Sequence, residues 1–267
     1  MKNFDIKRFW QTFKWYFYEN RGLILKWTAS VALVTAILEL LFVSIINMGK
    51  PSEPGFSPYT LGLFTANAMC VILIMFSVLF VNSNIFGWIK QKQKRIAFLT
   101  LPATNLERWT TAILYAAIII PACIIAGYLV GDLVRNIVFY LQGYEWVFGY
   151  DAFTMMAGKY GGSTTILSKI LNYVIIIWTV TFFVLGGTYF KKGQFIVISA
   201  IQLALTLTLG FLAKVCDAPL LNLWKIQDGA TGIAHLIILV VFSIFNLWLS
   251  YRIFKRFQII TSNWTNL

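Results

Sequence analysis

Six stretches of about 20 predominantly apolar residues dominate this sequence and limit the folds it can adopt. They lie approximately at residues 27–47, 61–86, 109–131, 166–190, 195–213 and 232–251. Each is long enough to cross the hydrocarbon core of a bilayer as an α-helix, because that core is about 30 Å thick. The runs are continuous rather than alternating, which argues against a transmembrane β-barrel. The sequence therefore predicts an all-α, polytopic membrane protein with six transmembrane helices.

The overall composition agrees with a chain surrounded by lipid. Of its 267 residues, 59% are hydrophobic and only 12% are charged, whereas soluble domains carry about 25% charged residues. No connection between the apolar runs is large enough to form a soluble domain. We therefore expect one transmembrane domain over residues 27–251, preceded by a cytoplasmic segment at 1–26 and followed by a cytoplasmic tail at 252–267.

The segment before the first span has the pattern of an amphipathic helix. Its aromatic and aliphatic side chains share one helical face, and its polar side chains share the other; the apolar set is Ile6, Phe9, Trp10, Phe13 and Phe17, and the polar set is Lys7, Gln11 and Lys14. This segregation is typical of a helix that lies in the membrane interface. We expect such an interfacial helix on the inner leaflet, with a turn at Gly22 into the bilayer.

Basic residues predict the orientation. With six spans, 16 of the 22 Lys and Arg residues fall on the side that also carries both termini. The positive-inside rule places that side in the cytoplasm, so we expect a multi-pass protein of the cell inner membrane. The formal net charge of +12 is then explained by topology and by contact with anionic lipid, without nucleic acid as a partner.

The connection between the second and third spans is the most informative one. A basic cluster is followed by a short apolar piece, and Pro102 then breaks the chain. Thr104 and Glu107 have the spacing of a capping box, which predicts the start of the next helix. The segment 87–101 is either a charged loop that only sets topology or a docking element for a cytoplasmic partner; the candidate docking residues are Trp88, Lys90, Lys92, Lys94, Arg95 and Phe98.

In its layout the chain resembles the permease subunits of type-2 ABC transporters. In that class an amphipathic elbow helix precedes six spans, and residues 4–20 match it. Residues 84–99 match the coupling helix that contacts a separate ATPase, and residues 101–104 match the Leu-Pro turn that follows it. The resemblance implies a cytoplasmic ATP-binding subunit and a second permease, either a homodimeric copy or a paired subunit. The chain contains no Walker A motif, so any ATP would be bound by the partner, and we expect neither enzymatic activity nor a cofactor in this chain.

A few polar residues inside the predicted spans are further candidates. Glu39 is the only acidic residue well inside a predicted span; it is either a proton or cation site or a protonated or hydrogen-bonded structural carboxyl. His235 and Gln202 are intramembrane polar candidates that more commonly hold helices together. Gly127 and Gly131 form a G-x-x-x-G pattern that allows close helix packing, within the chain or in a dimer.

The sequence as a whole favours the membrane subunit of an ABC-type exporter, energised by an ATPase that docks on residues 87–101. A membrane scaffold that transports nothing is one alternative, and a secondary carrier that uses Glu39 is another. Catalytic motifs such as H-E-x-x-H and G-x-S-x-G do not occur, and a single histidine cannot build a metal cluster. The sequence does not name a substrate.

Overall fold

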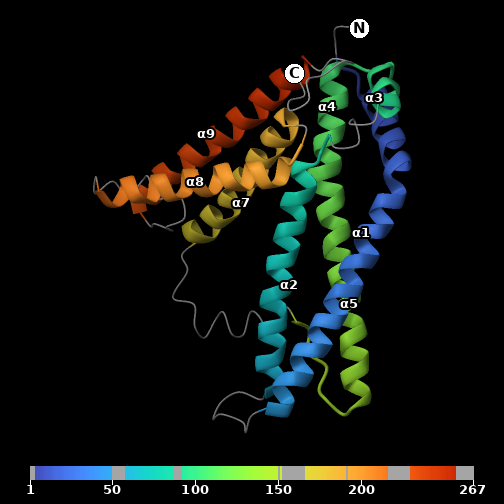
Figure 1. The fold of residues 1–267 in the computed structure, drawn as a ribbon, viewed down its shortest axis with the longest axis vertical. Helices are drawn as coiled ribbons and strands as arrows, with labels where there is room; N and C mark the ends of the chain where they lie inside the picture. The colour runs from blue at the N-terminus through green and yellow to red at the C-terminus, as the bar shows by residue number, and fades with distance from the viewer. Residues whose placement is uncertain are drawn as a thin grey trace. The chain divides into compact units, whose positions relative to one another are not determined.

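A computed structural model describes residues 4–49, 58–86, 92–149, 151, 166–190, 192–215 and 229–256. Figure 1 shows that the described regular structure is helical. The helices are α1 (Ile6–Gly49), α2 (Pro58–Ser83), α3 (Lys92–Leu99), α4 (Asn105–Leu114), α5 (Ile120–Leu141), α7 (Ile166–Tyr189), α8 (Gln194–Val215) and α9 (Gly229–Phe254), with a π-helical turn at Tyr115–Ile119. Among the described residues, six helical stretches are long and apolar enough to cross a membrane, which confirms the predicted all-α fold with six spans.

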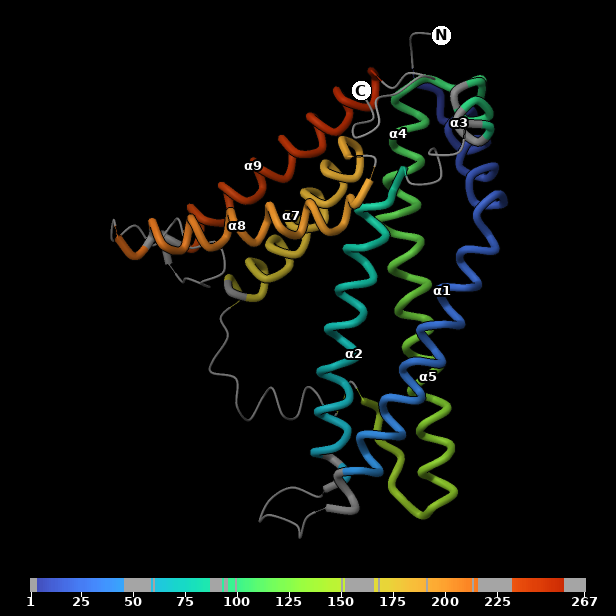
Figure 2. Tube along the Cα trace, in the orientation of Figure 1, coloured from blue at the N-terminus to red at the C-terminus, as the bar shows by residue number. Residues whose placement is uncertain are grey.

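The N-terminal helix differs from the sequence expectation. α1 runs for 44 residues without a break, as the continuous blue tube in Figure 2 shows, so the expected turn at Gly22 is absent. A single glycine costs a helix only about 1 kcal/mol, and no proline lies in this segment to interrupt it. The amphipathic segment and the first span therefore form one helix, and no separate interfacial helix ends before residue 27.

The third span is also longer than expected. The candidate span extends over Asn105–Leu141, whereas the sequence predicted residues 109–131. A π-helical turn at Tyr115–Ile119 comes just before Pro121, which lies in the first turn of α5. Proline cannot donate a backbone hydrogen bond and its ring crowds the preceding turn, and a wider π-turn accommodates both effects. The helix therefore continues past Pro121.

The chain divides into two compact units, which we describe separately. The α1–α2–α5 unit contains Tyr18–Val78 and Ile118–Ser163. Here Gly127 and Gly131 let α5 approach α1 closely: a Cβ atom on either residue would lie 2.6 Å from a backbone carbonyl oxygen of α1, that of Thr28 or Ala32. The G-x-x-x-G pattern thus packs helices within one chain, as small-residue motifs do in membranes. At the far end of α1, buried Val43, Leu63 and Phe139 join the three helices.

The α7–α8–α9 unit contains Met1–Phe17, Leu79–Ala117 and Thr164–Leu267. Its main contact is between α7 and α9, where Leu171, Trp178 and Leu239 form a buried apolar core. The hydroxyl oxygens of Thr188 on α7 and Ser250 on α9 are 2.8 Å apart, and Trp109 Nε1 donates to Ser250 Oγ at 3.2 Å. The first residues of α1 and the helices α3 and α4 belong to the same unit.

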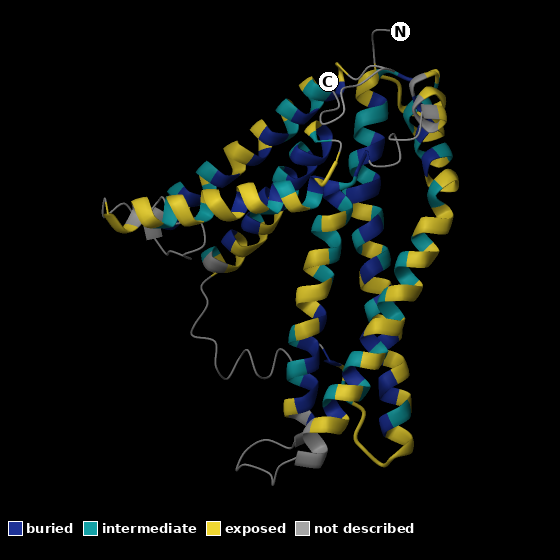
Figure 3. Ribbon diagram, viewed as in Figure 1, coloured by how far each residue is buried: buried dark blue, intermediate teal, exposed yellow. Residues whose placement is uncertain are grey.

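The outward faces of the helices are apolar. Leu33, Ile72 and Ile125 are each more than half exposed, and Figure 3 shows exposed residues running along the spans. Exposed aliphatic faces of this extent are unfavourable in water and are satisfied by lipid chains. Together with the lengths of the six helices, they identify a multi-pass membrane protein.

Candidate functional site

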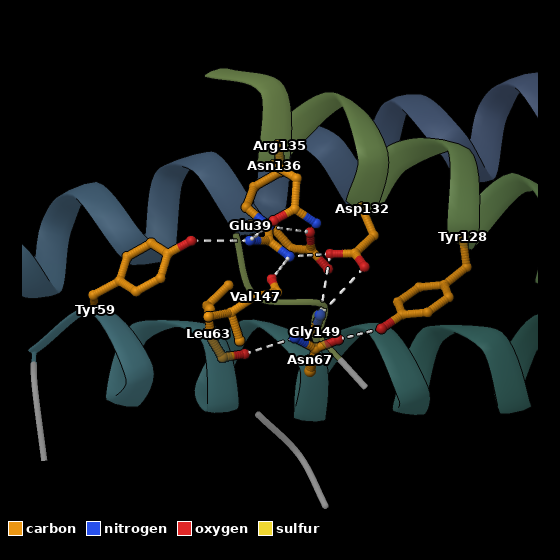
Figure 4. Close-up of polar contacts among 10 residues, drawn as sticks. All are labelled: Glu39, Tyr59, Leu63, Asn67, Tyr128, Asp132, Arg135, Asn136, Val147 and Gly149. Carbon is orange, nitrogen blue, oxygen red and sulfur yellow. Dashed lines mark hydrogen bonds and ion pairs between the residues drawn. The ribbon is translucent and has the colours of Figure 1, made fainter. Parts of the chain in front are cut away.

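The α1–α2–α5 unit contains a buried cluster of charged and polar side chains centred on Arg135 (Figure 4). α1 contributes Glu39, and α5 contributes Asp132, Arg135 and Asn136; each of these four residues is at most 1% exposed. α2 contributes Tyr59 and Asn67, which are also buried. Charged side chains inside a membrane protein are costly unless they find partners, so this cluster needs a specific explanation.

Every N–H donor of Arg135 has an acceptor. Nε donates to Glu39 Oε2 at 3.2 Å, and Nη1 donates at 3.0 Å both to the Tyr59 hydroxyl and to Asn136 Oδ1. Nη2 donates to Asp132 Oδ1 and, at 2.9 Å, to the Val147 carbonyl. Guanidinium has five donors, so the cation is fully satisfied without water.

The two carboxyl groups next to Arg135 have unequal surroundings. Asp132 lies one turn before Arg135 on α5 and forms an ion pair with it. The Gly149 backbone N–H also faces Asp132, at 3.3 and 3.2 Å from its two carboxylate oxygens. Glu39 receives only the Arg135 Nε–H, and its Oε1 has no hydrogen-bond partner among the described residues.

A second chain of hydrogen bonds joins α2 to α5 beside the cluster. The Tyr128 hydroxyl donates to Asn67 Oδ1 at 2.5 Å, and Asn67 Nδ2 donates to the Leu63 carbonyl at 2.9 Å. Asn67 thus links helices through its side chain, as expected for an intramembrane amide. Tyr128, Asp132 and Arg135 lie on one face of α5 because they are three to four residues apart.

The cluster corrects two expectations from the sequence. Asp132 and Arg135 were expected in an outer connection starting at residue 132, but α5 continues to Leu141 and places both inside the candidate span. Glu39 is therefore not the only acidic residue within a span. The missed signal is the i, i+3 spacing of Asp132 and Arg135, which lets the two charges neutralise each other on a single helix. Tyr59, Tyr128 and Asn136 were not singled out by sequence reasoning.

An apolar cleft lies between α1 and α2 in the same unit. It has a volume of about 190 Å³ and is lined by side chains that include Trp27, Val31, Thr35 and Cys70. Thr35, one of the lining residues, lies one helical turn before Glu39 on α1. Val34 and Leu73, which also line it, are more than 40% exposed, so the cleft opens on a lipid-facing surface.

The candidate docking residues differ in how far the structure describes them. Trp88 and Lys90 lie outside the described residues. Lys92, Lys94 and Arg95 lie on the short helix α3, where only the backbone is described. Phe98 is fully buried, so it anchors α3 instead of contacting a partner, which corrects its assignment as a docking contact.

Phe98 holds α3 against an aromatic cluster in the α7–α8–α9 unit. Its ring packs edge-on at 6.3 Å against Tyr16 of α1 and against Phe254 of α9. Tyr16 in turn packs at 4.8 Å on Tyr115, and Phe254 stacks at 5.2 Å on Phe86. The short helix is thereby connected through side chains to the ends of the helices around it.

The predicted capping box at Thr104 and Glu107 is confirmed. The Glu107 backbone N–H donates to Thr104 Oγ1 at 3.3 Å, and the Thr104 N–H donates to Glu107 Oε2 at 2.7 Å. Glu107 Oε1 also accepts from the Asp5 backbone N–H at 2.7 Å and from Arg8 Nη2 at 3.0 Å. This carboxylate joins the start of α1 to the start of α4.

The remaining intramembrane candidates, Gln202 and His235, lie in the α7–α8–α9 unit. Gln202 is buried and its Nε2 lies 3.5 Å from Thr179 Oγ1, at the limit of a hydrogen bond between α8 and α7. His235 is fully buried on α9, and neither ring nitrogen has a hydrogen-bond partner among the described residues. Glu39 belongs to the α1–α2–α5 unit, whereas His235 and Gln202 belong to the α7–α8–α9 unit.

Comparisons with known proteins add no relative to this picture: no protein-family model, curated protein or solved structure matches the chain.

Proposed function

We propose that this chain is the membrane permease subunit of an ATP-driven exporter, energised by a separate cytoplasmic ATPase that docks on α3. The proposal includes both termini in the cytoplasm of the cell inner membrane and a second permease, identical or paired, beside this one. ATP would be bound by the partner alone. The proposal rests on the resemblance in layout and on the structure around α3.

The observation that carries the proposal is how α3 is held. The helix is only eight residues long and rich in lysine and arginine, yet its Phe98 is fully buried between aromatic residues of α1 and α9. The turn after it is fixed by Arg108, whose Nη2 donates to the Leu101 carbonyl at 2.6 Å. A helix that only set topology would need no such anchor. A push on α3 would be transmitted directly to the ends of membrane-spanning helices.

Charge reversal on α3 tests this proposal. The full chain, extracted in mild detergent from its native membrane, should co-purify a Walker-type ATPase, and the triple change Lys92→Glu, Lys94→Glu and Arg95→Glu should abolish that association. The matched control reverses Arg252, Lys255 and Arg256 at the end of α9, with the same change in charge. Thermal unfolding of both triple variants establishes that they fold. Absence of an ATPase from the wild-type preparation would refute the proposal.

A secondary carrier is the second candidate, and the buried cluster at Arg135 is the observation that favours it. In that case Glu39→Gln would abolish transport in a chain that co-purifies no ATPase. A scaffold would bind partners but show neither transport nor stimulated ATP hydrolysis, and neither Glu39→Gln nor loss of ATP would change what it binds.

A further inference from the structure

The charged cluster around Arg135 is unbalanced. It contains one guanidinium and two carboxyl groups, Glu39 and Asp132, all at most 1% exposed. If both carboxyl groups were ionised, the cluster would carry one net negative charge inside a candidate span. An uncompensated buried charge costs several kcal/mol, roughly the whole stability margin of many proteins. The cluster therefore needs one more positive charge.

The hydrogen bonds indicate which carboxyl group binds the additional positive charge, a proton. Asp132 pairs with Arg135 Nη2 and also faces the Gly149 N–H, so both of its oxygens have donors. Glu39 has a donor on Oε2 only, and its buried Oε1 has none among the described residues. A proton on Oε1 removes the negative charge from the carboxyl group that has fewer donors, and the resulting acid still accepts the Arg135 hydrogen bond on Oε2.

The same contacts favour a proton over a metal ion. Hard cations require about six or more oxygen ligands. Within this cluster, Glu39 Oε1 is the one carboxyl oxygen without a donor, and the other unpartnered polar atom, Asn136 Nδ2, is itself a donor. A single free oxygen can bind a proton but cannot coordinate a cation of that kind.

We infer that Glu39 is a proton-binding site, occupied in the folded protein, at which a buried carboxylic acid and Arg135 share a hydrogen bond between α1 and α5. The cluster around it contains Arg135 and Asp132 on α5, Tyr59 on α2, and the Val147 carbonyl and Gly149 N–H beyond α5. Cys70 on α2 and Tyr128 on α5 also interact electrostatically with Glu39. Loss of the proton would leave Arg135 between two carboxylates. This inference does not depend on the proposed ATP-driven transport.

Infrared difference spectroscopy on the purified full chain in lipid nanodiscs tests the inference without an assay of function. At neutral pH the wild type should show the C=O stretch of a protonated carboxyl group, and Glu39→Gln should remove it. Glu145→Gln is the control, because Glu145 is an exposed carboxylate in the loop after α5 and its loss should leave the band unchanged. A wild-type spectrum without the band, or a band that survives in Glu39→Gln, would overturn the inference.

Thermal unfolding gives a second readout. Since glutamine is close in shape and charge to a neutral glutamic acid, Glu39→Gln should unfold within a few degrees of the wild type. Asp132→Asn should unfold at a clearly lower temperature or fail to fold, because it removes the ionised partner of Arg135. If Glu39→Gln were as destabilising as Asp132→Asn, Glu39 would be an ionised counter-ion and the site would hold no proton. Neither readout involves an ATPase, so failure here leaves the docking proposal standing, and the reverse also holds.

Discussion

Each unit of the protein contains an arginine–glutamate ion pair, and the two pairs lie in opposite surroundings. Arg135 and Glu39 are both fully buried, 3.2 Å apart, whereas Arg8 is 26% exposed and lies 3.0 Å from Glu107. The Glu107 carboxylate accepts hydrogen bonds from three donors: the Arg8 guanidinium and the backbone N–H groups of Asp5 and Thr104. Glu39 has one donor.

The difference concerns which partner is satisfied. At Glu107 the carboxylate is surrounded by donors, which is how an ionised carboxylate is stabilised. At Glu39 it is the arginine that is surrounded by acceptors, and the glutamate is left incomplete. A short distance between an arginine and a glutamate therefore does not by itself show that both are charged. The number of hydrogen-bond donors around the carboxyl group is the better guide to whether it is ionised.

The sharpest way to break this comparison is to remove each arginine. Arg135→Met should destabilise the protein by about 3–5 kcal/mol, because it leaves Asp132 as a buried charge without its cation. Arg8→Met should cost about 1 kcal/mol or less, because the pair is partly exposed and Glu107 keeps its backbone donors. Denaturant unfolding in mixed micelles measures both. Equal losses would show that the burial of the Arg135 pair carries no special cost.

A smaller effect is expected at the helix contact that positions the buried pair. Gly131 of α5 faces Thr35 of α1, one helical turn from the contact between Arg135 and Glu39. A Cβ atom at Gly131 would therefore push α1 away from α5. Gly131→Ala should destabilise by about 1–3 kcal/mol, as overpacking does. A Cβ atom added at Gly210 on α8 would meet no neighbouring group within 4 Å. Gly210→Ala should therefore leave the stability of the protein unchanged or raise it by up to about 1 kcal/mol. The same unfolding measurement should show a loss of stability for Gly131→Ala and no loss for Gly210→Ala; a neutral Gly131→Ala would mean that the helices can shift apart freely.

The smallest effect sharpens the other half of the comparison. Thr104→Ala removes the side-chain half of the capping box and should cost about 1 kcal/mol. Thr110 lies within α4 and its hydroxyl donates only to its own helix, at the Leu106 and Glu107 carbonyls, so Thr110→Ala is a matched control that should change stability by no more than a few tenths of a kcal/mol. Thermal unfolding resolves the two if they are measured side by side. Identical midpoints would indicate that α4 starts without help from its cap.

The sequence was sufficient to predict the six spans and the cap at Thr104, because both depend on local patterns. Span lengths follow from hydropathy, and a capping box needs two residues at fixed spacing. The charged cluster could not be predicted in this way, because its members come from three helices and a loop. Asp132 and Arg135 were assigned to the connection after the third span, which was expected to end at residue 131. Only the packing of α5 on α1 shows that both charges remain inside.

Glu39 was recognised from the sequence as a candidate, but its partner was not. An isolated intramembrane glutamate indicates that a partner exists without indicating which helix supplies it. Likewise, Phe98 was grouped with its basic neighbours because it shares their short segment, whereas the structure buries its side chain. The burial of Phe98 depends on Tyr16 and Phe254, which are far from it in the sequence.

The position of Asp132 and Arg135 one turn apart also affects how the protein is made. During synthesis the segment that becomes α5 leaves the ribosome after α1 and α2, and its charges must pass into the bilayer before they can meet those helices. Because the aspartate and the arginine neutralise each other on the same helix, this segment brings its own counter-ion during insertion. Glu39 and Tyr59 are then needed only at the later step, when the inserted helices assemble.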